Sequence, residues 1–288
     1  MIIERFAPSP TGLLHLGHAY SAWVAWKAAR DAGGEFLLRF EDLDTSRVRP
    51  HFVEAIEQDL RWLGLDWDGT PIYQSQRNKA YQQALTTLSA MGLTYHCTCT
   101  RADIRAALSA PQEGAPGPDG PIYPGTCRDA GHTGGDSAIR LNMTKAAAVL
   151  GNAKLSFQEI GHGPNGETGT IVVEPSEMIA TTGDVVLSRR DGAVAYHLAV
   201  VVDDAETQVT HVTRGQDLFT ATQIHVVLQA LLALPTPVYR HHALVRDENG
   251  KRLAKRDDAR AIAAFREAGL SAEQVLALAQ DGIRTVKP

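Results

Sequence analysis

The sequence lacks a long hydrophobic run and lacks an excess of positive charge. Its longest apolar stretch, VVLQALLAL at 226–234, is far shorter than the roughly 18 to 20 residues of a membrane span, so we expect no membrane segment. The first residues, MIIERFAP, do not resemble a secretory signal, which makes the cytoplasm the expected location. The formal net charge of −5 offers nucleic acid no general attraction, so RNA would need a local basic patch.

Cysteine is also scarce, with three residues at positions 97, 99 and 127. An odd number of cysteines in a reducing compartment argues against a disulfide framework. Closely spaced thiolates beside a loop rich in Gly and Pro are typical of a structural zinc site, which takes four tetrahedral ligands. The candidates for the fourth ligand on chemistry alone are His96, Tyr123, Asp129 and His132. The alternative is three small, partly buried thiols with no metal.

Strands and helices alternate in the first part of the chain. Strands are predicted at 2–7, 35–44 and 94–100, and helices at 19–34, 51–65 and 76–92. This alternation predicts an α/β fold with a parallel sheet. Residues 109–137, dominated by Gly, Pro, Ala and Asp, are predicted to be loop. The short segments AIRLNM, KLSFQEI, TIVVE and GDVVLSRRDG that follow predict a β-rich insertion.

The α/β pattern returns after this insertion with AVAYHLAVVVDDAE, THVTRG and the helix-like DLFTATQIHVVLQALLAL. A hairpin turning at 248–250 and a short helical segment are predicted to follow. The predicted division is therefore a split α/β domain at 1–95 and 186–240, an insertion at 96–185, and a C-terminal part at 241–288.

The stretch RFAPSPTGLLHLGHAYSAW at 5–23 has the pattern of a phosphate site. A helix N-terminus attracts anions through its free N–H groups and its dipole. Gly12 permits a tight turn and Gly17 a close approach of a nucleotide, while His15 and His18 are placed to donate to phosphate oxygens. The alternative is two ordinary histidines near a helix start.

Three segments resemble one enzyme family. APSPTGLLHLGH, ending at His18, resembles the first signature of class I aminoacyl-tRNA synthetases, in the form of their glutamate-specific branch. RFEDLDTSR at 39–47 resembles a segment after the family's second strand, and KRLAKR at 251–256 resembles its second signature loop. The resemblance covers about residues 3–260. It implies a Rossmann-type catalytic domain split by a zinc-bearing insertion.

The resemblance also implies the roles of particular residues. His15, His18 and Lys255 would be catalytic, because they stabilise charge on the phosphates of ATP, and Gly17 and Arg252 would also contact ATP. Magnesium is expected with ATP. Ala254 departs from the serine usual in the second signature. The residues implied to bind glutamate are Arg5, Ala7, Ser9, Glu41, Tyr196 and Arg214.

Within this set, Arg5 and Arg214 supply the planar guanidinium that suits the side-chain carboxylate of glutamate. The family counterpart of Glu41 contacts the ammonium group of the amino acid. The pattern C-x-C…Y-x-x-x-C resembles the zinc site of one subfamily and favours Tyr123 as the fourth ligand beside Cys97, Cys99 and Cys127.

Few residues follow Arg256, too few for the helical anticodon-binding region of a full glutamyl-tRNA synthetase. A shortened synthetase with a zinc-bearing insertion resembles the glutamyl-queuosine tRNA(Asp) synthetase family. This resemblance implies activation of L-glutamate by ATP without tRNA, then transfer to queuosine in the anticodon arm of tRNA(Asp), by a monomer. The alternatives are a truncated glutamyl-tRNA synthetase acting on tRNA(Glu) and a non-catalytic paralogue that binds nucleotide or RNA.

Overall fold

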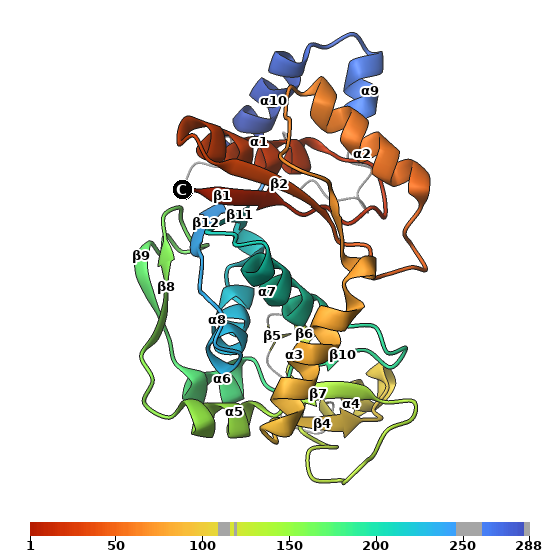
Figure 1. Ribbon diagram of the computed structural model, residues 1–288, viewed down its shortest axis with the longest axis vertical. Helices are drawn as coiled ribbons and strands as arrows, with labels where there is room; N and C mark the ends of the chain where they lie inside the picture. The colour runs from red at the N-terminus through yellow and green to blue at the C-terminus, as the bar shows by residue number, and fades with distance from the viewer. Residues whose placement is uncertain (109–115, 118–119, 246–260, 285–288) are drawn as a thin grey trace.

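The structure, a computed structural model, describes residues 1–108, 116–117, 120–245 and 261–284 (Figure 1). A parallel sheet lies near its middle. One half contains β1 (Ile3–Phe6), β2 (Glu35–Phe40) and β3 (Ile72–Tyr73), all parallel. The other half begins with β11 (His211–Gly215) beside β12 (Val238–His242), also parallel. Thr210 N donates to Ile3 O at 3.0 Å where the two halves meet. The prediction of an α/β fold with a parallel sheet is confirmed.

The middle of the chain contributes to two different sheets. β8 (Leu155–Glu159) pairs in parallel with β12, and β9 (Gly169–Val173) forms an antiparallel hairpin with β8. A separate antiparallel sheet has the order β10–β7–β4. Its strands are β4 (Thr94–Cys97), β7 (Ala138–Leu141) and β10 (Val186–Ser188). The two-residue strands β5 (Pro116–Gly117) and β6 (Gly120–Pro121) pair with each other.

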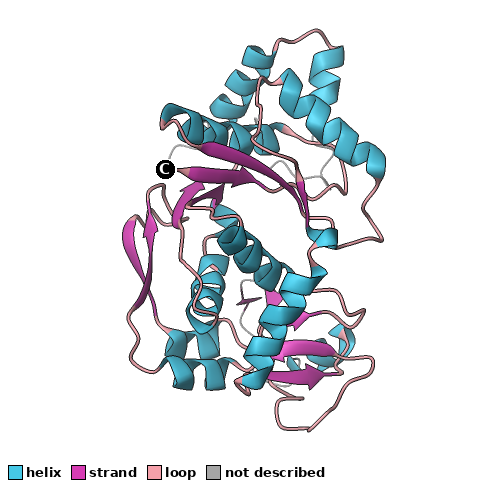
Figure 2. Ribbon diagram, viewed as in Figure 1, coloured by secondary structure: helices cyan, strands magenta, loops and turns pink. Residues whose placement is uncertain are grey.

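Helices cover both faces of the parallel sheet (Figure 2). On one side lie α1 (Leu16–Asp31), α2 (Pro50–Trp62), α9 (Ile262–Glu267) and α10 (Ala272–Arg284). On the other side lie α3 (Asn78–Ala90), α7 (Tyr196–Glu206) and α8 (Ala221–Leu231). The remaining helices are α4 (Arg101–Leu108), α5 (Met143–Leu150) and α6 (Pro175–Thr181). None of the helices described here is long and apolar enough to cross a membrane.

Each face of the sheet has its own hydrophobic core. Phe36 and Leu38 of β2 pack with four buried alanines of α1, at 19, 22, 25 and 29, and with Val275 of α10. These small side chains let α1 lie close to both the sheet and α10. The core on the other face includes Leu198 and Val201 of α7 and Ile224 of α8.

Several predicted elements were wrong. The strand predicted over 35–44 ends at Phe40, and Asp44, beyond it, accepts from Ser46 and Arg47 in a local turn. Helices α5 and α6 lie between the predicted strand segments of the insertion, where no helix was predicted. The first helix begins at Leu16, three residues before its predicted start. The predicted turn at 248–250 lies outside the described residues, and β12, before it, has only parallel neighbours among the described strands. The domain division stays a prediction.

Candidate active site at the carboxyl ends of the parallel strands

A cavity of about 620 Å³ lies where the strands β1, β2, β11 and β12 end. Open α/β sheets commonly bind their ligands at this edge. Nine residues singled out in the sequence line it: Arg5, Ala7, Ser9, His15, Gly17, His18, Glu41, Tyr196 and Arg214. Segments about 200 residues apart in the sequence therefore form one pocket. Arg252 and Lys255 lie outside the described residues.

His15 and His18 form a reciprocal cap at the start of α1. The Nδ1 atom of His15 accepts from Gly17 N at 3.1 Å, and that of His18 accepts from His15 N at 3.2 Å. A ring nitrogen that accepts carries no proton, so each neutral ring has its proton on Nε2. The two rings lie 3.8 Å apart between centroids. The cap therefore supplies two Nε2–H donors at the positive end of the helix dipole.

Gly17 has a structural reason to be glycine. A Cβ at this position would lie 3.0 Å from Cε1 of His15, closer than side chains normally pack. The missing side chain therefore leaves room for the His15 ring as well as for a ligand beside the helix.

The guanidinium of Arg214 is buried among neutral groups. Its Nη2 donates to Thr222 Oγ1 at 2.6 Å and to Leu218 O at 3.2 Å, and its Nη1 lies 3.5 Å from the Tyr196 hydroxyl. Among the residues that the structure describes, no carboxylate lies in ion-pair contact with Arg214. Because only 5% of Arg214 is exposed, an anion in the pocket would meet a largely desolvated positive charge.

Two buried histidines complete the surroundings of Arg214. Its Nη1 lies 3.4 Å from Nδ1 of His225, and its Nε lies 3.1 Å from Nε2 of His241. Burial and the nearby Arg214 charge lower the pKa of His225 well below its usual value. Burial also lowers the pKa of His241, and the Arg214 charge adds to the effect. Both shifts favour the neutral ring, whose unprotonated nitrogen can accept from the guanidinium.

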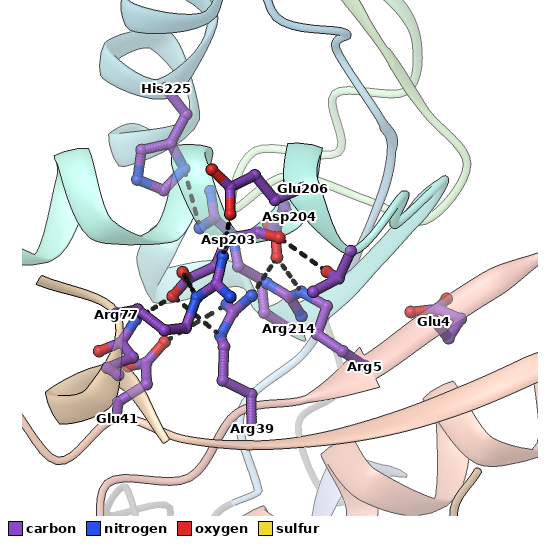
Figure 3. Close-up of polar contacts among 12 residues, drawn as sticks. Glu4, Arg5, Arg39, Glu41, Arg77, Asp203, Asp204, Glu206, Arg214 and His225 are labelled. Atoms are coloured by element: carbon purple, nitrogen blue, oxygen red, sulfur yellow. Dashed lines mark hydrogen bonds and ion pairs between the residues drawn. The ribbon is translucent and has the colours of Figure 1, made fainter. Parts of the chain in front are cut away.

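Arg5, in contrast, has a direct carboxylate partner (Figure 3). Its Nε lies 3.1 Å from Oδ1 of Asp204, and the same oxygen lies 2.5 Å from Nη1 of Arg39. Burial disfavours the charge on Asp204, but the two arginines outweigh burial and lower its pKa. The adjacent Asp203 accepts from Arg77 Nε at 2.6 Å. This ionic network of Arg5, Arg39, Arg77, Asp203 and Asp204 fixes Arg5 in the pocket wall.

Sequence reasoning missed most of this network. Its one visible signal is the acidic pair Asp203-Asp204, which interrupts the apolar helix sequence LAVVVDD. Both aspartates are buried, and buried carboxylates need cationic or hydrogen-bonding partners. The identity of those partners is a long-range property that the local pattern does not contain.

Glu41 has the most shifted carboxyl group in the pocket. It follows β2, its side chain is 14% exposed, and Oε1 lies 3.6 Å from Nη2 of Arg39. Burial raises the pKa of Glu41 to about 7, because it weakens hydration of the charged form; Asp204 and Asp203 add to the rise, and Arg39 and Arg5 oppose it. An ammonium group bound beside Glu41 would favour its charged form.

The residues on either side of the range 246–260 both lie at this site. Val245 lines the pocket, and Ala261 forms a β-bridge with His15. Ile262 N donates to Leu14 O at 2.9 Å. The C-terminal helices are thus attached directly to the segment that carries His15 and His18.

The three cysteines gather at a second, distant site, near β4. Their sulfur atoms lie within 4.8 Å of one another, with Cys99 and Cys127 3.4 Å apart. The Tyr123 hydroxyl lies 3.4 Å from the sulfurs of both Cys97 and Cys99. Tetrahedral zinc with Zn–S bonds of about 2.3 Å separates its sulfurs by roughly 3.8 Å. The cluster therefore fits a metal ion.

Of the predicted candidates for a fourth ligand, the Tyr123 hydroxyl is the one in contact with the sulfurs. His96 Nδ1 instead bonds Ser137 Oγ at 2.8 Å, and His132 Nε2 lies 3.4 Å from Thr98 Oγ1. These contacts favour Tyr123 over both histidines.

Comparison with known proteins shows the family of the chain. The sequence matches the family described as "tRNA synthetases class I (E and Q), catalytic domain" over residues 1–282, so the chain belongs to this family and is a ligase. It is 54% identical to a glutamyl-Q tRNA(Asp) synthetase of Rhodobacter capsulatus, over 94% of this chain and 96% of that protein. It is 47% identical to a glutamyl-Q tRNA(Asp) synthetase of Nocardia farcinica, over 97% of this chain and 84% of that protein. These names confirm the resemblance inferred from the sequence.

The fold is also similar to a crystal structure of a glutamate-tRNA synthetase from Elizabethkingia anophelis. The TM-score is 0.71 and the sequence identity 28%, and the match covers 89% of this chain. The chain spans about half of that longer protein, 53% of its length.

Proposed function

We propose that this enzyme activates L-glutamate with ATP to form glutamyl-adenylate, and that it does so without tRNA. The observation that carries the proposal is that Arg214 and Glu41 both line one pocket. Arg214, with no carboxylate partner among the described residues, suits the side-chain carboxylate of glutamate. Glu41 suits its ammonium group, which leaves the α-carboxylate to react.

ATP would lie beside the start of α1. The Nε2–H groups of His15 and His18 would donate to its phosphate oxygens, assisted by the positive end of the helix dipole. The α-carboxylate oxygen of glutamate attacks the α-phosphorus, a new P–O bond forms, and the P–O bond to pyrophosphate breaks. Negative charge on the phosphate oxygens increases in this transition state, and donors fixed in advance stabilise it.

Lys255 and Arg252 are proposed to contribute further positive charge to the triphosphate. Both belong to the range 246–260, whose described neighbours Val245 and Ala261 lie at the pocket. Magnesium bound with ATP would neutralise phosphate charge.

The second product is proposed to be a glutamyl ester on queuosine in the anticodon arm of tRNA(Asp). A hydroxyl of the modified base would attack the adenylate carbonyl carbon and release AMP. The support for this acceptor is the name shared by the relatives from Rhodobacter capsulatus and Nocardia farcinica, glutamyl-Q tRNA(Asp) synthetase. Aminoacylation of tRNA(Glu) is the second candidate, supported by the likeness to the glutamate-tRNA synthetase fold.

Zinc is proposed at Cys97, Cys99, Cys127 and Tyr123. It would be structural, because four protein ligands would leave no open coordination position for a substrate. The site would tie the end of β4 to the segment around Cys127.

Two assays test the proposed function. Wild-type protein should catalyse glutamate-dependent exchange of pyrophosphate into ATP with no RNA present; absence of exchange would contradict activation without tRNA. Labelled glutamate should then enter tRNA(Asp) that contains queuosine, and not unmodified tRNA(Asp) or tRNA(Glu). Equal labelling of tRNA(Glu) would favour the second candidate.

A further inference from the structure

Three buried side chains contact one another in series from the pocket into the sheet. Nε of Arg214 donates to Nε2 of His241 at 3.1 Å, and Nδ1 of His241 lies 2.5 Å from Oε2 of Glu159. Neither His241 nor Glu159 has any exposed side-chain area. Arg214 and His241 come from the neighbouring strands β11 and β12, and Glu159 ends β8 on the far side of β12.

The surroundings of Glu159 fix how His241 is protonated. Oε1 of Glu159 accepts from His241 N at 2.9 Å and from Gly161 N at 2.7 Å, while Oε2 faces the ring. A carboxylate only accepts, so Nδ1 of His241 must carry the ring proton. Its Nε2 then presents a lone pair to Arg214. The glutamate therefore determines that His241 is an acceptor.

The backbone near Glu159 is closely fitted to this arrangement. A Cβ at Gly161 would lie 2.1 Å from His241 O and 3.0 Å from Oε1 of Glu159. Glycine at this position therefore allows the turn after β8 to close onto β12 and present its N–H to the carboxylate.

We propose that Glu159, acting through His241, is a positioning residue that sets the specificity of Arg214 for a substrate carboxylate. Asp204 bonds Arg5 directly, whereas the imidazole of His241 separates the Glu159 carboxylate from Arg214. The negative charge can thus orient Arg214 through its Nε, while Nη1 and Nη2 bond only neutral groups among the described residues. The inference rests on the proposed glutamate site.

The variant Glu159→Gln tests the role of the carboxylate. The amide oxygen would keep the two backbone bonds, so the amide N–H₂ would face Nδ1 of His241. The ring would then accept at Nδ1 and carry its proton on Nε2, opposite the Nε–H of Arg214. We expect the KM for glutamate in pyrophosphate exchange to rise at least tenfold, with kcat and the KM for ATP within threefold of wild type. The preference for glutamate over glutamine should also fall.

Glu4→Gln is the matched control. Glu4 is also buried, and it accepts from the backbone and hydroxyl of Thr213, the residue before Arg214 on the same strand. Its side chain makes no bond to Arg214. The KM for glutamate should stay within threefold of wild type. An equal rise in both variants would show a general packing effect and overturn the proposal.

A second pair of variants applies even if Glu159→Gln does not fold. His241→Gln keeps an oxygen that can accept from Arg214, whereas His241→Met has similar length and no comparable acceptor. We expect a rise in KM for glutamate of less than threefold for the first and more than tenfold for the second. Equal values would overturn the inference alone. Absence of exchange by the wild-type protein would overturn the proposed function and, with it, this inference.

Discussion

The pocket and the cysteine cluster are assembled in opposite ways. The pocket takes its charged groups from β1, from the residue after β2 and from β11, and an ionic network with Asp204 of α7 anchors Arg5. The cluster takes all its ligand atoms from residues 97–127, and these atoms face each other. The first arrangement leaves Arg214 without a carboxylate partner among the described residues, whereas the second directs three sulfur atoms and a hydroxyl toward one another.

Because of this difference, we expect variants in the pocket to affect substrate binding and variants in the cluster to affect stability. A change in the pocket should alter catalysis while the metal stays bound. A change in the cluster should alter metal content and unfolding while the KM for glutamate stays constant at temperatures where the protein is folded. The following variants test that separation.

Arg214→Ala should have the largest effect, because it removes the cation proposed for the substrate carboxylate. Loss of one partner of a buried charge pair costs about 4 kcal/mol, so kcat/KM for glutamate in pyrophosphate exchange should fall about 1000-fold. Metal content, measured by elemental analysis, should not change. Arg61→Ala, at an exposed arginine paired with Glu57, is the control. More than a tenth of wild-type activity in Arg214→Ala would contradict the proposed role.

Cys127→Ser should have the largest effect at the other site. We expect the bound metal to be lost and the melting temperature to fall by about 5 to 10 °C, since a structural metal contributes several kcal/mol to folding. The KM for glutamate below the transition should change less than twofold. Asp129→Asn, at a residue first considered as a ligand, should keep the metal. Loss of metal from Asp129→Asn would show that the proposed ligand set is wrong.

A third test uses the pH dependence of the pocket. Burial raises the pKa of Glu41 to about 7, and the substrate ammonium should bind only its ionised form. Below this pKa a proton must leave before glutamate binds, so the KM for glutamate should rise about tenfold from pH 8 to pH 6. Glu41→Gln should raise the KM and remove this pH dependence. A wild-type KM that is constant over this range would exclude Glu41 as the ammonium partner.

Tyr123→Phe should have the smallest effect. It removes one proposed ligand and the hydrogen bond from Cys127 N at 2.9 Å, and it leaves three thiolates in place. We expect the metal to be retained and the melting temperature to fall by about 2 to 4 °C, corresponding to roughly 1 kcal/mol. A fall as large as that of Cys127→Ser would show that the hydroxyl is indispensable, and an unchanged temperature would exclude it as a ligand.

Local patterns predicted much of the first half of the fold. The helices α1, α2 and α3 each carry a clear helical sequence, and the errors there concern only their ends. Helix α5 was missed, although Asn142 caps its first turn and Gly151, with φ of 52°, ends it. Those two residues are ordinary boundary signals of a helix. The β-branched and apolar segments around them favoured the wrong interpretation.

The candidate site was predicted by family resemblance rather than by geometry. Every predicted pocket residue within the described part of the chain lines one cavity, but their roles remain predictions. The sequence could not reveal that Arg5 has a carboxylate partner while Arg214 bonds neutral groups. That distinction depends on Asp204, the partner of Arg5, and on His241, the partner of Arg214. Each partner lies outside the local sequence of its arginine and becomes its neighbour only in the folded structure.

The ion pair between Arg5 and Asp204 joins residues 199 positions apart. Contacts of such long sequence separation require the closure of a long loop, which costs entropy and slows folding. During synthesis, Arg5 leaves the ribosome long before Asp204 and Arg214 do. The nascent chain therefore cannot complete this pocket until Asp204 and Arg214 have both been synthesised.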